Sequence, residues 1–334
     1  KTCNVGIDLA WFRKRLEFTA GWYKNTSEDL LYAVPVPEQA GVSNTTVTMN
    51  AASMNNSGFE FSATYRNRDH DFKYEVSANL STLRNRVTSL GFGTDSYISG
   101  SYITKVGQEI GQFYGWVYEG IARTQEDLDN HATQEGAQIG DCLYKDVNND
   151  GKVDSEDQVV LGSGMPKINF GLNARFEYKR FDLSIATFGA LNYHVSDDIY
   201  NSLNSCYGWG NKEVGMLEAN RFSEDGSTYL SNVPRTYVTN SASLGWNDLF
   251  SSRKIQNAAY WKIANVELGY NFPDKWFGKY VSDVRFYVSA QNLHTFTGYH
   301  GYNVDYAGGT FTPGYNFCSY PTARTFMCGV HFTF

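Results

Sequence analysis

The chain has 334 residues, of which 42% are hydrophobic, 16% aromatic and 19% charged, and this composition excludes a disordered protein. With 28 Lys and Arg against 35 Asp and Glu, the formal net charge is −7, so no nucleic-acid partner held through its phosphates is expected. Mean hydropathy is −0.43 and no apolar run reaches about 18 residues, which excludes a membrane-spanning helix but not a membrane β-barrel with alternating strands.

Residue usage favours β structure over helix. The chain has 24 Tyr, 22 Phe, 7 Trp and 31 Gly but only 7 Pro, so the predicted fold class is all-β. An odd number of cysteines without metal-finger spacing gives no sign of a disulfide scaffold. The five are Cys3, Cys142, Cys206, Cys318 and Cys328. The first residues already read as a strand, so any targeting segment is expected to lie outside the chain.

About nine stretches alternate apolar and polar residues with a period of two, as strands with one apolar face and one solvated face do. In the sharpest, every second residue from Ile168 to Tyr178 is apolar, and the residues between them are polar or Gly. The predicted strands are Val5 to Phe12, Leu16 to Tyr23, Phe59 to Arg66, Phe72 to Ser81, Lys167 to Tyr178, Phe181 to Leu191, Trp261 to Phe272, Val284 to Asn292 and Arg324 to Phe334. Trp261 and Ile263 lie out of phase with Val266, which predicts a β-bulge between them.

The connections between these strands alternate between short and long. Tight charged turns are expected at 13–15, 67–70 and 179–180, with a modest one at 273–282. The long connections, rich in Gly, Asn, Ser and Tyr, are Asn25 to Gly58, Leu83 to Pro166, Asn192 to Asn257 and Leu293 to Thr322. Outer-membrane barrels alternate in this way, with short periplasmic turns and long extracellular loops.

The predicted architecture is therefore an antiparallel transmembrane β-barrel of which this chain is the C-terminal portion. Bacterial single-chain barrels use an even number of strands, so an odd count implies at least one strand before the chain. The alternative is a secreted β-sandwich carbohydrate-binding module, whose strands also alternate. Such a module should purify without detergent, whereas a barrel portion should not.

One loop motif matches a calcium-binding pattern. From Asp146 to Asp157 the sequence places oxygen-bearing side chains at positions 1, 3 and 5, Gly at position 6 and a carboxylate at position 12. Its expected ligands are Asp146, Asn148, Asp150, the carbonyl of Lys152, Asp154 and Asp157. The alternative is an Asx-rich turn that binds nothing. A bound Ca²⁺ would serve as a structural clamp.

No catalytic residues are predicted, because the sequence has no GxSxG, HExxH or P-loop, and its six histidines lack metal-ligand spacing. Surface glycoside hydrolysis by a carboxylate pair is a third, weaker reading. Aromatic rings in the long loops could instead stack on sugars or contact peptides. These substrate-binding candidates are Tyr207, Trp209, Trp246, Tyr299, Tyr302, Tyr315 and Phe317. For each ring, self-packing of the loops is the competing explanation.

Several blocks resemble, in one order along the whole chain, the C-terminal region of SusC/RagA-type TonB-dependent outer-membrane transporters. The blocks are Asn25 to Leu31, Asn55 to Glu60, Ile110 to Ile121, Gly140 to Gly151, Gly162 to Phe170, Trp261 to Pro273, Tyr287 to Leu293, Phe296 to Tyr302, Tyr320 to Pro321 and Gly329 to Phe334. Phe332 and Phe334 are similar to the signal that the barrel-assembly machinery reads.

This resemblance implies a barrel of about 22 strands, plugged by an N-terminal domain, in the bacterial outer membrane. It implies a SusD-like surface lipoprotein as partner, energy from TonB, and uptake of oligosaccharides or oligopeptides without covalent chemistry. Residues 1–334 would then be the C-terminal part of the barrel, in contact with outer-membrane lipid, with a calcium-loop-like insert at 141–161. The plug and the first strands are not among these residues.

Overall fold

The computed structural model describes residues 1–35, 46–91, 93–206, 210–236, 245–273, 276, 283–305 and 308–333. Ten antiparallel strands form its main sheet, nine of them in one path, β1-β2-β3-β4-β12-β13-β16-β17-β19, with β5 paired to β3. They are β1 (Thr2–Trp11), β2 (Leu16–Pro35), β3 (Thr46–Asn67), β4 (Phe72–Thr82), β5 (Arg84–Leu90), β12 (Ile168–Tyr178), β13 (Phe181–Leu191), β16 (Tyr260–Asn271), β17 (Asp283–Thr297) and β19 (Thr325–Thr333). The predicted all-β class and the nine strands are confirmed.

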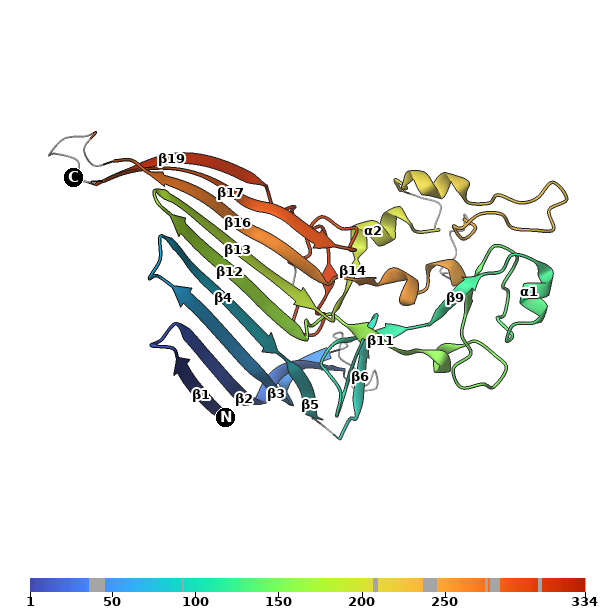
Figure 1. The fold of residues 1–334 in the computed structure, drawn as a ribbon. Coiled ribbons are helices and arrows are strands. Elements are labelled where there is room, and N and C mark those ends of the chain that lie inside the picture. Colours follow the sequence, from blue (N-terminus) through green and yellow to red (C-terminus); the bar gives the residue numbers. More distant parts are fainter. Residues whose placement is uncertain are drawn as a thin grey trace.

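Short and long connections lie at opposite ends of this sheet. In Figure 1 the strands run side by side, with tight turns at the left-hand end and the long connections at the right, and β1 and β19 form the two edges. Phe12, Arg13 and Lys14 have φ of 53°, 56° and 63°, and Lys179 has φ of 55°, so the chain reverses within a few residues at these turns. The predicted alternation of connections is confirmed.

The main sheet has a polar face and an apolar face. The polar face carries Glu17, Glu75 and Arg175, whereas Val5 and Ile7, on the apolar face, are 64% and 53% exposed. A β-sandwich would bury its apolar face under a second sheet. Within the described part of the chain this face is uncovered from β1 to β19, so the sandwich reading loses its support.

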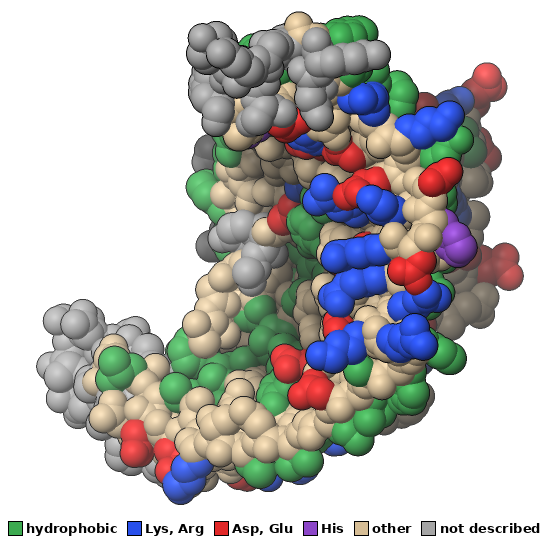
Figure 2. Space-filling model, turned by 60° about the vertical axis from the view of Figure 1, so that its left-hand side comes forward, with side chains coloured by type: hydrophobic (Ala, Val, Ile, Leu, Met, Phe, Trp, Pro, Cys, Tyr) green, Lys and Arg blue, Asp and Glu red, His purple; other side chains and the backbone are tan. Residues whose placement is uncertain are grey.

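Charged side chains on the polar face pair across neighbouring strands. Arg66 contacts Glu17 at 2.9 Å and Glu75 at 3.1 Å, so one guanidinium joins β2, β3 and β4. Figure 2 shows the molecule hollowed like a trough, with Lys, Arg, Asp and Glu side chains gathered in a band along its wall. This polar lining beside an uncovered apolar face is the pattern of a wide barrel wall.

A β-bulge lies where the phase of β16 was expected to change. The pairing register shifts between Ile263 and Asn265 against β17 and at the same place against β13. Trp261 is therefore on the apolar face, where its ring stacks on Phe296 with centroids 5.3 Å apart. Lys262 turns to the polar face and is 5% exposed.

The predicted loop from Asn25 to Gly58 is wrong over most of its length, because β2 continues to Pro35 and β3 begins at Thr46. The two strands pair from Leu16 to Pro35 with register shifts near Ser27 and Leu30. These shifts interrupt the period-two pattern, and Leu30, Ala52 and Met54 pack into a small core with Val87 and Ile110. Period-two analysis therefore missed this extension.

The remaining long connections fold into small sheets and short helices beyond the end of the main sheet. The small strands are β6 (Ser96–Ser99), β7 (Tyr102–Lys105), β8 (Gln112–Gly115), β9 (Tyr118–Ile121), β10 (Cys142–Tyr144), β11 (Val159–Ser163), β14 (His194–Asp197), β15 (Gln256–Asn257) and β18 (Tyr315–Asn316). The helices are α1 (Gln125–Asp129), α2 (Asp198–Leu203), η2 (Ser155–Asp157), η3 (Val214–Glu218), η4 (Trp246–Asp248) and η5 (Ser252–Lys254). Across the described residues, none of the helices has the length and apolarity to cross a membrane.

The C-terminal strand ends at the short-turn end, as expected. Phe332 pairs with Val284 near the start of β17 and is half-exposed on the apolar face. Phe334 lies outside the described residues. The role of these two residues in barrel assembly stays a prediction.

Candidate functional site

A cavity of about 660 Å³ opens on the polar face where the main sheet meets the long connections. We call it the wall cavity. The sheet contributes Tyr23, Asn25, Asn85, Asn169 and Tyr260, and the connections contribute Tyr193 and Asp305, among others. Amides, phenols and one carboxylate thus converge from segments distant in sequence. Apolar side chains, among them Ile110 and Met165, line it as well, so the cavity suits a solute with both hydrogen-bonding and apolar groups.

The carboxylate of the wall cavity, that of Asp305, is neutralised by a buried lysine. Lys262 donates from Nζ to Asp305 Oδ2 at 2.5 Å, and the lysine itself is buried under the cavity. Tyr193 donates its hydroxyl to Val304 O at 2.8 Å, and burial together with the nearby Asp305 carboxylate raises the pKa of Tyr193. The phenol therefore stays protonated at neutral pH and fixes the backbone beside Asp305.

Asn25 differs from the other cavity amides. The Asn85 Nδ2 group donates to Asn56 Oδ1 at 2.7 Å, and Asn85 Oδ1 accepts from the Ile110 N–H at 2.9 Å. Asn25 Oδ1 is buried, yet it has no hydrogen-bond partner within the described part of the chain. A buried acceptor without a partner costs free energy, which a bound donor would recover.

Two of the predicted stacking residues serve the packing of the loops instead. Trp246 donates from Nε1 to Glu135 O at 2.8 Å, and its ring packs beside Tyr144. Tyr299 is 6% exposed, and its hydroxyl donates to Asp197 while accepting from Asn316 Nδ2 at 2.8 Å. Packing of the loops against one another, the competing explanation, therefore accounts for both rings.

Three other predicted residues are open to solvent. Tyr302 and Phe317 are each 67% exposed and Tyr315 is 36% exposed, all in the connection between β17 and β19. Tyr207 and Trp209 lie outside the described residues. The exposed rings lie on the surface of the loops and do not line the wall cavity, so ring contacts and cavity contacts would involve different parts of a ligand or partner.

The calcium-like loop folds as a tight series of turns. Asn149 and Gly151 have φ of 60° and 86°, a left-handed conformation that Gly adopts without strain. Asp146 accepts from the N–H groups of Asn149 at 2.6 Å and Gly151 at 2.8 Å. The sequence spacing therefore produces the expected reversal at position 6.

Asp157 anchors the end of this loop. Its carboxylate accepts from the N–H groups of Val147 at 2.8 Å and Asp154 at 2.9 Å, and from Asn148 at 3.3 Å. Burial opposes ionisation, but these donors outweigh it and lower the pKa of Asp157 below its ordinary value. Asp157 therefore stabilises the loop as an anion. This contribution is fully present at pH values above the pKa of an ordinary Asp.

The other expected ligands also accept from backbone groups. Asn148 Oδ1 accepts from Asp150 N, and Asp150 Oδ1 from Lys152 N, each at 2.9 Å, while Asp154 accepts from Glu156 N at 2.8 Å. Over the described ranges, no group of three or more His, Cys, Asp and Glu side chains is placed to share a metal ion. Calcium binding would require these side chains to converge further.

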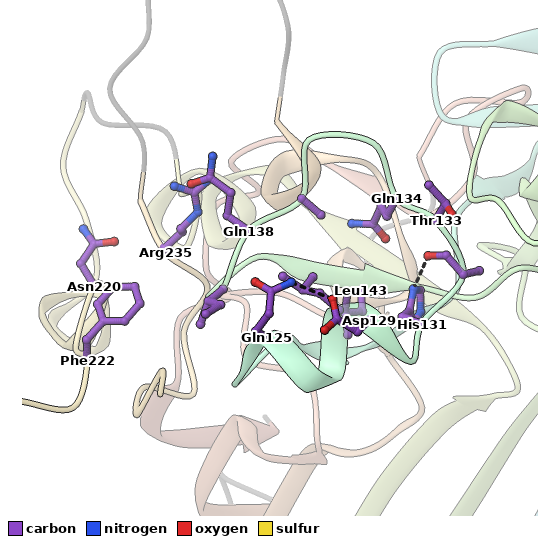
Figure 3. Close-up of a pocket in the computed structure, with 14 residues that line it drawn as sticks. Gln125, Asp129, His131, Thr133, Gln134, Gln138, Leu143, Asn220, Phe222 and Arg235 are labelled. Atoms are coloured by element: carbon purple, nitrogen blue, oxygen red, sulfur yellow. Dashed lines mark hydrogen bonds between the residues drawn. The ribbon is translucent and has the colours of Figure 1, made fainter. Parts of the chain in front are cut away.

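A second cavity, of about 720 Å³, lies among the long connections. In Figure 3, Gln125, Asp129 and His131 line it on one side, and Asn220 and Phe222 on the other. Arg235 also lines it and forms an ion pair that sequence reasoning missed, from its Nε to Asp141 Oδ1 at 2.5 Å. Neither residue lies in a catalytic or metal-binding pattern, so no sequence signal marks the pair.

No family model matches the chain. It is 30% identical over 353 residues to TonB-dependent receptor P3 of Formosa agariphila and 25% identical over 340 residues to TonB-dependent receptor SusC of Bacteroides thetaiotaomicron. Both matches cover 100% of the chain, but 34% and 32% of those relatives. The resemblance to SusC/RagA-type TonB-dependent transporters is confirmed.

A structure of the RagAB peptide transporter has a TM-score of 0.79 to the chain at 21% identity, covering 98% of the chain and 34% of that protein. This likeness establishes the fold, so the curved sheet has the fold of a portion of that β-barrel. The chain spans about a third of the length of the curated relatives it matches. The names of these relatives describe receptors and transporters, in keeping with the absence of a predicted catalytic residue.

Proposed function

We propose that the chain forms part of the wall of a bacterial outer-membrane importer for oligosaccharides or oligopeptides, energised through TonB and working with a SusD-like surface lipoprotein. The observation that carries the proposal is the wall cavity, which lies on the polar face of a barrel wall, next to the loop end. A solute entering between the loops would meet this cavity before passing along the charged wall.

The lining combines hydrogen-bonding groups with apolar side chains such as Met54, Ile110 and Met165, which favours an oligomer with both polar and apolar groups. Asn25 and Asn169 contribute amides, a group that both donates and accepts, while Tyr23 and Tyr260 add phenol rings. Peptide bonds and sugar hydroxyls have matching donor and acceptor pairs. The RagAB transporter in the comparison is named for peptides, and this supports oligopeptides over oligosaccharides as the substrate class.

A surface lipoprotein partner is supported by the exposed rings at the loop end. Tyr302 and Phe317 lie in one connection and leave two thirds of their surface in solvent. Aromatic side chains of this kind are typical anchors of protein interfaces. A lid seated on them would close the wall cavity from outside.

We expect Asn25→Ala to weaken solute binding about five-fold without unfolding the protein, because Asn25 lines the cavity and its Oδ1 has no hydrogen-bond partner among the described residues. The measurement is retention of a tryptic peptide mixture, and separately of neutral oligosaccharides, by the complete transporter with its lipoprotein. Asn173→Ala is the matched control, since Asn173 is an exposed residue of β12 outside the cavity. Equal retention by both variants would count against the wall cavity as the binding site.

We further propose that the loop from Asp146 to Asp157 binds Ca²⁺ as a structural clamp. Both carboxylates also accept backbone hydrogen bonds without metal, so Asp146→Ala with Asp150→Ala is expected to lower stability in chelator as well, and by about 2.7 kcal/mol more with calcium at 100 times Kd. Thermal unfolding with calcium and with chelator measures this, with exposed Glu156→Ala as control. An equal loss of stability with calcium and with chelator would refute the clamp.

A further inference from the structure

Two short turns of the main sheet concentrate positive charge. The turn between β1 and β2 contains Arg13, Lys14 and Arg15, and the turn between β12 and β13 consists of Lys179 and Arg180. Neither turn contains an acidic residue, although the chain as a whole has a net charge of −7. The positive sign is therefore a local property of these turns.

Most of these cations are available to a ligand. Arg15 pairs with Asp69, and Arg180 donates to Asn271 O at 3.4 Å. Arg13, Lys14 and Lys179 are exposed, and within the described residues they form no ion pair. The Lys179 ammonium lies 5.1 Å from the centroid of the Tyr178 ring, so this cation is held next to an aromatic surface.

Exposed rings flank both turns. Trp11 and Phe12 enter the first turn and are 43% and 71% exposed. Tyr178 and Phe181 border the second turn and are 47% and 53% exposed. Cations within one or two residues of uncovered rings are arranged as in membrane interfaces, where rings lie at headgroup level and long basic side chains reach the phosphates.

We propose that each of these two turns binds the headgroup of an anionic phospholipid. The phosphate would accept from Arg13 and Lys14 at the first turn and from Lys179 at the second, while the flanking rings contact the acyl chains. Four strand spacings of about 4.8 Å separate the turns, roughly 19 Å, so they hold separate lipids. The inference rests on the proposed location in a membrane and adds a lipid class to it.

The test compares retention of phosphatidylglycerol and phosphatidylcholine by the complete transporter, purified in detergent and analysed by native mass spectrometry. Wild type is expected to retain phosphatidylglycerol preferentially. Lys14→Gln and Lys179→Gln should each weaken one site about five-fold. Lys73→Gln, which removes the same charge from the polar face of β4, should leave retention unchanged.

Four outcomes separate the explanations. Equal retention of both lipids by wild type would overturn the headgroup sites while leaving the membrane location intact. So would a loss of phosphatidylglycerol in Lys73→Gln as large as that in Lys14→Gln or Lys179→Gln. Displacement of phosphatidylglycerol by inorganic phosphate would assign the turns to free anions and overturn the lipid assignment. Retention of neither lipid would likewise overturn the headgroup sites and leave the membrane location intact.

Discussion

Gly164→Ala is expected to dislodge the connection between β17 and β19 from the wall cavity and to abolish most solute binding. A Cβ at Gly164 would overlap the carbonyl group of Pro313 and the nitrogen of Gly314, which are backbone atoms that cannot rotate away. Gly164 and Pro313 both line the cavity. Overpacking of this kind costs about 3 kcal/mol at its upper range.

The displacement should spread to a neighbouring connection, because the Ser196 N–H donates to Gly314 O at 2.9 Å. Solute binding by the complete transporter and limited proteolysis of residues 308–314 measure the effect. Gly298→Ala is the matched control, since a Cβ there meets no atom within 4 Å. If Gly164→Ala binds solute and resists protease like Gly298→Ala, the close approach is not needed for the cavity.

Asp141→Ala is expected to open the loop region between α1 and η4. Asp141 is 3% exposed and accepts from Arg235 Nε at 2.5 Å, Asn247 Nδ2 at 2.7 Å and Gln138 N at 2.8 Å. Removing the carboxylate takes this acceptor from a partly buried guanidinium and leaves the Asn247 amide with Arg235 O alone as acceptor. Breaking such a pair costs about 3 kcal/mol.

Hydrogen exchange provides the readout, since the Cys142 N–H donates to Asn247 Oδ1 at 2.6 Å. A local cost of about 3 kcal/mol corresponds to roughly 100-fold faster exchange at Cys142. Asp129→Ala removes an exposed carboxylate of the same region, which accepts from Gln125, and should leave that exchange rate unchanged. Similar rates in both variants would mean that the region is held together by its apolar contacts alone.

The alternation of side chains was sufficient to predict most of the barrel wall. Ile168 to Tyr178 was predicted and found as a strand, and the phase change at Ile263 marked a real bulge. These features follow from local geometry, since successive residues of a strand point to opposite faces. Prediction failed for β2 and β3 beyond Asn25, where register shifts near Ser27 and Leu30 interrupt the alternation.

The candidate site was less predictable than the wall. Aromatic content alone could not distinguish Tyr299, which is buried on Asp197, from Tyr302, which is exposed three residues later. Asp305 was not predicted either, because its importance arises from Lys262, 43 residues earlier in the chain. Burial and pairing of this kind depend on which loops meet in space.

The sequence by itself determined the strands, their two faces, the short turns and the similarity to SusC/RagA-type transporters, because each is written in neighbouring residues or in ordered blocks. Only the tertiary structure decided where Asn25, Tyr193 and Asp305 come together, and which loop carboxylates are committed to backbone donors. The physical reason is that the wall is built from local alternation, whereas the cavity and the loops are built from long-range packing and hydrogen bonds that no local pattern encodes.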